Sequence, residues 1–157
     1  MKLIAYTPAL VPTEKIADYH LPPEQLIFSG LPLDAIEKAT ADDSRLPVFL
    51  EDQGNFPTFM ILHSWPGPQI YTDNQQAVLL RSYSTDSRFQ GQGYADASLK
   101  LLPAFTREHF PTAEELILGV NSKNGKAIKL YQKHGFTETL PPLTTEYGQL
   151  LLMTLPL

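Results

Sequence analysis

Gly91 and Gly93 occupy an expected turn between a strand and a helix, where the backbone could bind an anion. The apolar run 77–80 predicts a buried strand before this turn, and apolar residues at helical spacing predict a helix that starts near Gln92. Glycine allows close approach of a ligand, and the free N–H groups of a helix's first turn would point at it. These donors and the helix dipole favour phosphate, although two glycines alone would also suit a plain tight turn.

Two common phosphate-binding loops do not fit this stretch. No Gly-Lys-Ser/Thr sequence follows the glycines, as a Walker loop requires. The dinucleotide-binding pattern requires Gly or Ala three positions beyond Gly93, and Asp96 stands there instead. The glycines therefore belong to a different kind of loop.

The pattern Gln90-x-x-Gly93-x-Ala95 resembles the Q/R-x-x-G-x-G/A signature of the GNAT-family N-acetyltransferases. In that family the signature cradles the pyrophosphate of acetyl-coenzyme A. Arg88-x-x-Gly91-x-Gly93 fits the same signature two residues earlier. We prefer the later register because Gln90–Gly91 then matches the Arg/Gln-Gly pair that is common in the family.

A second motif follows the strand-like run 116–120 and resembles the family's N-x-x-A-x-x-L-Y-x-K-x-G-F helix. Every specified position is matched, by Asn124, Ala127, Leu130, Tyr131, Lys133, Gly135 and Phe136. The resemblance covers residues 77–136 well and the N-terminal half only loosely. It implies that acetyl-coenzyme A is the co-substrate and that an amine is the acceptor.

The resemblance also assigns the residues that would bind the coenzyme. The diphosphate is expected on the backbone amides of the glycine loop, which comprises Gln90, Gly91, Gln92, Gly93, Tyr94 and Ala95. The pantetheine arm resembles a short peptide and is expected to pair with the strand before the loop, along Tyr83, Ser84 and Thr85. Asn121 or Asn124 would cap the second helix, and Asn124 would also help hold the coenzyme. Lys126 and Lys133 could contact phosphates or simply face solvent.

Tyr131 is the candidate catalytic residue. When an amine attacks a thioester the leaving group is a thiolate, and a phenol with a pKa of about 10 is protonated at neutral pH and can donate to it. The matching tyrosine has this role in the family. Without the motif, Tyr131 would be read as a core residue, because it shares an apolar helix face with Ala127, Ile128 and Leu130.

The general base is left open by the sequence. Many family members carry a carboxylate on the strand before the glycine loop, but Arg81 is the only charged residue between Ala77 and Ser84. The base could be water, a carboxylate from elsewhere, or His63 at an expected strand end, which could equally be a hydrogen-bonded surface histidine. Trp65 and Tyr71 could form the walls of an acceptor pocket or pack structurally.

The composition fits one globular domain over residues 1–157, with 43% hydrophobic and 18% charged residues. The net charge of −5 argues against nucleic acid as a partner and favours a cationic acceptor. The absence of cysteine removes disulfides and thiolate chemistry and fits a cytoplasmic location. No His/Asp/Glu spacing indicates a metal site, and no apolar run indicates a membrane span or signal peptide.

The remaining elements predict an α/β or α+β fold, and the resemblance implies a mixed, mostly antiparallel, splayed central sheet flanked by helices. Strands are expected at 3–6, 46–50, 57–62, 136–140 and 149–155, with Pro141–Pro142 interrupting before the last strand. Helices are expected from a Thr13 cap to Tyr19 and from Pro32, with Leu33 and Ile36 on an apolar face. Residues 25–28 are expected to form a short strand or buried loop.

Three functional hypotheses follow. The leading one is an N-acetyltransferase that acts on a primary amine by direct attack. The second is a domain that binds acyl-coenzyme A without turnover, which the missing strand carboxylate favours and Tyr131 opposes. The third is a plain structural domain, which requires both motifs to be accidental. The apolar C-terminal strand could also pair across subunits to form a homodimer.

Overall fold

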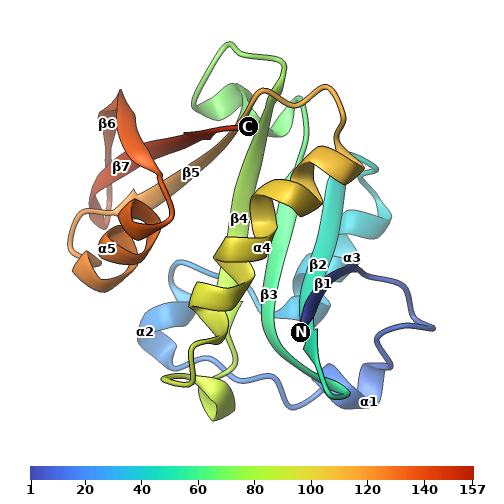
Figure 1. Ribbon diagram of the computed structural model, residues 1–157. Coiled ribbons are helices and arrows are strands. Elements are labelled where there is room, and N and C mark those ends of the chain that lie inside the picture. Colours follow the sequence, from blue (N-terminus) through green and yellow to red (C-terminus); the bar gives the residue numbers. More distant parts are fainter.

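A computed structural model describes residues 1–157 and contains one seven-stranded sheet in the order β1-β2-β3-β4-β5-β7-β6 (Figure 1). Only β4 and β5 run parallel, and every other neighbouring pair is antiparallel. This confirms the predicted mixed, mostly antiparallel sheet. The strands are β1 Lys2–Ala5, β2 Arg45–Asp52, β3 Asn55–His63, β4 Ala77–Thr85, β5 Glu115–Asn121, β6 Thr137–Thr145 and β7 Gly148–Pro156.

Helices cover both faces of the sheet. Helices α4 and α5 pack over one face, while α1 and α3 pack against β2 and β3 on the other (Figure 1). None of the helices is both long and apolar enough to cross a membrane. The α-helices are α1 Thr13–Ile16, α2 Pro23–Leu26, α3 Pro32–Thr40, α4 Tyr94–His109 and α5 Gly125–Lys133, and the 3₁₀ helices are η1 Gly67–Ile70 and η2 Ser87–Phe89.

The sheet opens in its middle because β4 and β5 pair over a short stretch only. Their ladder runs from Ala77–Glu115 to Leu79–Ile117. Beyond it, β4 stays with β3 as far as Thr85, whereas β5 stays with β7 as far as Asn121. The two halves of the sheet therefore diverge and leave a wedge between them (Figure 1).

A backbone irregularity lies on β4 where this wedge begins. Ser82 has a φ of 54°, and the pairing with β3 shifts register between Phe59 and Ile61. A positive φ is uncommon for a residue other than glycine. Such bulges bend a strand and re-aim its side chains, so the irregularity changes the direction of β4 next to the wedge.

Two cores hold the sheet between its helices. The larger lies between the sheet and α4 and α5, and includes Leu99, Leu102, Leu118 and Phe136. The other lies on the opposite face, where Phe49 packs against Phe56 and Phe59 beneath α1 and α3. The helices that border the wedge are thus fixed by ordinary apolar packing.

The prediction for residues 25–28 is wrong, because α2 forms at Pro23–Leu26. Proline at the first helical position has a φ already suited to a helix. The apolar side chains that suggested burial are largely exposed, by 43% for Leu26, 52% for Ile27 and 53% for Phe28. Of the three, Phe28 lines the space between β4 and β5.

The predicted interruption at Pro141–Pro142 is also wrong, since β6 continues through both prolines to Thr145. β6 lies at the edge of the sheet and pairs only with β7. Prolines are tolerated on edge strands and at bulges, and here the pairing shifts register between Leu140 and Leu143.

Several local predictions near helix ends can be compared with the structure. Thr13 does not cap α1, because Pro12 occupies the cap position and the helix ends at Ile16. On α3, Leu33 is 41% exposed, while Ile36 is buried as expected. Gly135, which follows α5, has a φ of +94°.

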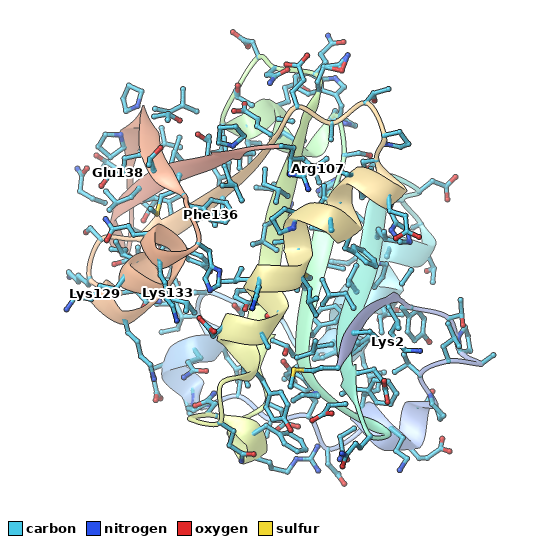
Figure 2. The ribbon with its side chains drawn as sticks, viewed as in Figure 1. Lys2, Arg107, Lys129, Lys133, Phe136 and Glu138 are labelled. Atoms are coloured by element: carbon cyan, nitrogen blue, oxygen red, sulfur yellow. The ribbon has the colours of Figure 1, made fainter.

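We expect Phe136→Ala to lower the free energy of unfolding by about 3–5 kcal/mol, because it leaves a cavity in the core. Phe136 is 1% exposed and points inward, whereas Lys129 projects outward from α5 (Figure 2). Urea denaturation measures the change, with Phe28→Ala, an exposed phenylalanine, as the matched control. Equal midpoints for the two variants would contradict this packing.

Candidate functional site

The wedge contains a cavity of about 260 Å³, here called the inner cavity. Its walls are residues 79–83 of β4, residues 118–121 of β5, Tyr71 after η1, and Tyr131 of α5. Residues from both faces of the sheet line it, so the cavity lies in the gap between the two strands. Asn124 and Tyr131 of the second motif line this cavity, whereas the glycine loop does not.

Two further hollows adjoin the inner cavity. An outer cavity of about 780 Å³ is lined by Ser29 and Tyr83, which the inner cavity shares, and by the charged residues Glu24, Lys123 and Glu146. A groove of about 330 Å³ runs between the glycine loop and α5. Asn124 lines all three, which makes them neighbouring parts of one site.

The glycine loop presents a run of free backbone donors. Gly91 and Gly93 have φ values of +78° and +86°, and Gly93 is the N-cap of α4. No backbone N–H from Gln90 to Asp96 donates a hydrogen bond within the protein. Lys126 of α5 lines the same groove. Unpaired N–H groups at a helix N-terminus bind anions, so this end of the site is suited to phosphate.

The side chains of the loop are mostly turned toward the protein. The amide of Gln90 donates to the Thr85 carbonyl at 2.9 Å, and the amide of Gln92 donates to the Arg88 carbonyl at 3.4 Å. The Tyr94 hydroxyl donates to Asp52 at 2.9 Å. These contacts leave the backbone of the loop as the surface that a ligand would meet.

Asp86 anchors the loop, and the sequence analysis did not single it out. Its side chain is 1% exposed. It accepts hydrogen bonds from the Arg88 guanidinium at 2.6 and 3.0 Å, from the Arg88 backbone N–H at 3.1 Å, and from the His20 backbone N–H at 3.4 Å. An aspartate that bonds the backbone two residues later is a recognised turn signal, and this could have identified it.

The end of β4, where pantetheine pairing was predicted, is held by other parts of the chain. The Tyr83 carbonyl accepts from the Ser29 hydroxyl at 3.2 Å, and the Ser84 carbonyl accepts from the Tyr19 hydroxyl at 2.9 Å. The Thr85 carbonyl accepts a hydrogen bond from the Gln90 side-chain amide. These contacts involve residues 54 and 65 positions away in the chain, so sequence motifs gave no sign of them.

The side chains of Tyr83 and Tyr131 lie together but have different surroundings. The Tyr83 hydroxyl is bonded to the Ala95 carbonyl at 2.8 Å and to Ser98 at 2.6 Å. The half-buried Tyr131 ring lies 6.3 Å from the Tyr83 ring and 5.7 Å from the Phe136 ring, centroid to centroid. Its hydroxyl has no hydrogen-bond partner in the protein and is not sealed from solvent.

Burial raises the pKa of the Tyr131 hydroxyl above its ordinary value. The phenol therefore keeps its proton across the neutral and moderately alkaline range. A protonated hydroxyl without a protein acceptor can donate to a group placed in the inner cavity.

His63, a candidate base, does not line the inner cavity. It is 5% exposed, and its Nε2 lies 3.0 Å from the Ser44 hydroxyl. Burial, with further contributions from Arg45 and Arg81, lowers the pKa of His63. Of the two aromatic residues considered for an acceptor pocket, Tyr71 lines the inner cavity, whereas Trp65 lines a separate small hollow.

Helices α4 and α5 are joined by an ion-pair cluster beside the groove. Asp96 accepts from Lys133 at 2.7 Å and from His134 at 2.9 Å. These two hydrogen bonds, from Lys133 first and then His134, lower the pKa of Asp96. Lys133 is therefore engaged with Asp96, while Lys126 is the exposed cation that borders the glycine-loop groove.

Comparison with known proteins gives a consistent match. The family model described as "Acetyltransferase (GNAT) family" matches residues 13–136. A Bacillus subtilis protein described as an uncharacterized N-acetyltransferase, YbbJ, is 34% identical over 139 residues, which is 88% of this chain and 86% of that protein. The N-terminal half, which resembled the family only loosely by motif, therefore falls within the match.

Solved structures share the fold at low sequence identity. An aminoglycoside acetyltransferase, AAC(6')-Ib, in complex with coenzyme A and kanamycin has a TM-score of 0.73 at 15% identity, covering 99% of this chain and 94% of its own. A ribosomal-protein-alanine N-acetyltransferase from Brucella melitensis has a TM-score of 0.65 at 19% identity, covering 100% of both chains. The fold is thus common to proteins whose acceptors differ.

We expect Asp86→Ala to lower the free energy of unfolding by roughly 1.5–3 kcal/mol, because it leaves buried donors without their charged partner. Urea denaturation measures the loss. Asp34→Ala, which removes an exposed aspartate from α3, serves as the control and is expected to change stability by less than about 0.5 kcal/mol. Similar stability for both variants would show that Asp86 does not hold the loop.

Proposed function

The chain belongs to the acetyltransferase (GNAT) family, and we propose that it transfers the acetyl group of acetyl-coenzyme A to a primary amine, with Tyr131 as the general acid. The observation that carries this proposal is the position of Asn124. It lines both the groove with the free loop amides and the inner cavity with the free Tyr131 hydroxyl. A phosphate site and a proton donor therefore adjoin one another.

The residues present fit the coenzyme. The free N–H groups from Gln90 to Asp96 would hold the diphosphate, and Lys126 would add a positive charge beside it. The uncharged arm would pass Asn124 and follow the end of β4 at Tyr83 to Thr85 toward the inner cavity. The coenzyme supplies an activated acetyl thioester, and the protein supplies its orientation and a proton.

Tyr131 accounts for the proton that the leaving group needs. As the amine nitrogen bonds to the acetyl carbon, the carbon–sulfur bond breaks and the sulfur takes its electron pair. The Tyr131 hydroxyl gives its proton to that sulfur, so coenzyme A leaves as a thiol. The acceptor nitrogen loses two protons on its way from ammonium to amide, and one of them restores the Tyr131 hydroxyl. The raised pKa of Tyr131 supports the starting state of this step, in which the phenol is protonated.

The proton that the acceptor ammonium must lose before attack needs a separate route. No Asp or Glu lines the inner cavity, while Glu24 and Glu146 line the outer one. We propose that water or one of these two glutamates removes it. The absence of a carboxylate in the inner cavity also favours the second candidate function, in which the domain binds acyl-coenzyme A without turnover.

Replacing Tyr131 with Phe tests the acid role. We expect kcat to fall by about 10²–10⁴-fold, since a positioned proton donor contributes that much, while the Kd for acetyl-coenzyme A stays within about twofold. Free-thiol release across a broad panel of amines measures turnover, and calorimetry measures binding. Tyr6→Phe removes a hydroxyl outside the site and serves as the control, with unchanged kcat expected.

Two results would count against the acid role or against turnover. Equal rates for wild type and Tyr131→Phe would exclude Tyr131 as the acid. Binding without thiol release for any amine would favour the binding-only function over the enzyme.

The glycine loop can be tested separately. Gly93→Pro forces a φ near −65° on a position that requires +86°, and we expect at least about a tenfold rise in the Kd for coenzyme A. Gln92→Ala removes only a side chain that faces the protein, and we expect less than about a twofold change. Calorimetry measures both, and thermal unfolding reports whether each variant is folded. The reverse order of effects would mean that side chains, not the backbone, bind the coenzyme.

A further inference from the structure

Arg81 is the only charged side chain among the residues that line the inner cavity. It lies on β4 just before the irregular Ser82, and its side chain is half-buried. No carboxylate lies within ion-pair distance of it, whereas Arg45, Arg88 and Lys133 each pair with an aspartate. Its only hydrogen bond within the protein is from Nη1 to Nδ1 of His63, at 3.3 Å.

The charges around Arg81 do not balance. Asp42 is the carboxylate of this cluster, and it pairs with Arg45 at 3.1 Å and accepts from Ser44 at 2.5 Å. His63 contributes no positive charge, because its Nδ1 accepts from Arg81 and its lowered pKa favours the neutral form. One carboxylate therefore faces two guanidinium groups, and the uncompensated charge is the one beside the cavity.

The hydrogen-bonding capacity of Arg81 is also mostly unused. A guanidinium has five N–H donors, and the contact with His63 uses one. None of its nitrogens is both buried and without a partner, so the remaining donors reach open space. Arg81 is only partly exposed, and this burial lowers the pKa of its guanidinium. Such a charge is costly without an anionic partner.

The coenzyme does not provide that partner. Its anionic groups are phosphates, and the free loop amides and Lys126 lie in the groove on the other side of Asn124. The arm and the acetyl thioester that would approach the inner cavity carry no charge. An anion beside Arg81 must therefore belong to the other substrate.

We propose that the acceptor is an amino acid-like amine whose carboxylate is bound by Arg81 in the inner cavity; this rests on the proposed acetyl transfer. Two N–H groups on one edge of a guanidinium can donate two parallel hydrogen bonds to the two oxygens of a carboxylate. Ile70, Leu79 and Leu150 line the same cavity and would contact the carbon part of the acceptor. The carboxylate would fix the distance from the amine to the thioester, so Arg81 acts as a specificity-determining residue.

The test compares matched acceptors in the wild-type protein and in Arg81→Gln. Each of three amino acids, glycine, L-phenylalanine and 4-aminobutyrate, is compared with its carboxamide, which keeps the amine and lacks the negative charge. Phosphoethanolamine tests a phosphate in place of the carboxylate. Thiol release gives kcat/KM for each. Lys100→Gln removes an equal charge from the exposed face of α4 and serves as the control.

For the best acid we expect a kcat/KM about 10- to 100-fold higher than for its carboxamide, the range expected for hydrogen bonds to a charged group. Arg81→Gln should bring the two within about twofold and leave the Kd for acetyl-coenzyme A unchanged, while Lys100→Gln should keep the preference. Equal use of acids and carboxamides by the wild type would overturn the proposal, as would a preference for phosphoethanolamine over every carboxylate.

A binding measurement separates this inference from the proposed function. The N-acetyl forms of the same amino acids, with coenzyme A present, are titrated by calorimetry into wild type and Arg81→Gln, and thermal unfolding verifies that the variant is folded. If no acceptor is turned over, the enzyme proposal fails, but binding of an N-acetyl amino acid that is lost in Arg81→Gln would still support the carboxylate site. No binding to the wild type would overturn it.

Discussion

The structure depends on the inability of β4 to pair with β5 along its whole length. Both strands begin side by side, and each then follows a different partner, β3 for β4 and β7 for β5. An antiparallel neighbour on the outer side of each strand satisfies its backbone there, so the inner edges can separate without unfolding the sheet. The gap that results lies between the two strands and contains the inner cavity.

Around this gap, the backbone N–H groups of the glycine loop are free to bind a ligand, whereas its polar side chains hydrogen-bond within the protein. At the glycine loop the backbone donors are free and the side chains of Gln90, Gln92 and Tyr94 are occupied by the protein. Asp86 and Ser29 fix the strand end that leads to the loop. A loop held from behind in this way can present its N–H groups without reorganising, which is the arrangement that favours anion binding.

The inner cavity brings together a neutral proton donor, Tyr131, and a cation, Arg81. Burial keeps the proton on Tyr131, while Arg81 keeps a positive charge with few partners. The overall charge of −5 suggested a cationic acceptor, but that average does not describe the cavity. Glu24 and Glu146 lie in the outer cavity, so an acceptor with an amine and a carboxylate would find charges of both signs along the site.

The sequence by itself determined the features that depend on neighbouring residues. Gly91 and Gly93 lie in the expected turn between β4 and α4, and Asn124 caps α5 through the Ala127 N–H. The two motifs also indicated the family and the mixed, splayed sheet. Only the tertiary structure decided where α2 lies, why Arg81 lacks an anionic partner, and that His63 is not in the cavity. These features depend on contacts between residues far apart in the chain, such as Ser29 with Tyr83 and Ser44 with His63. The spacing of residues along the chain does not reveal which segments will become neighbours in the fold.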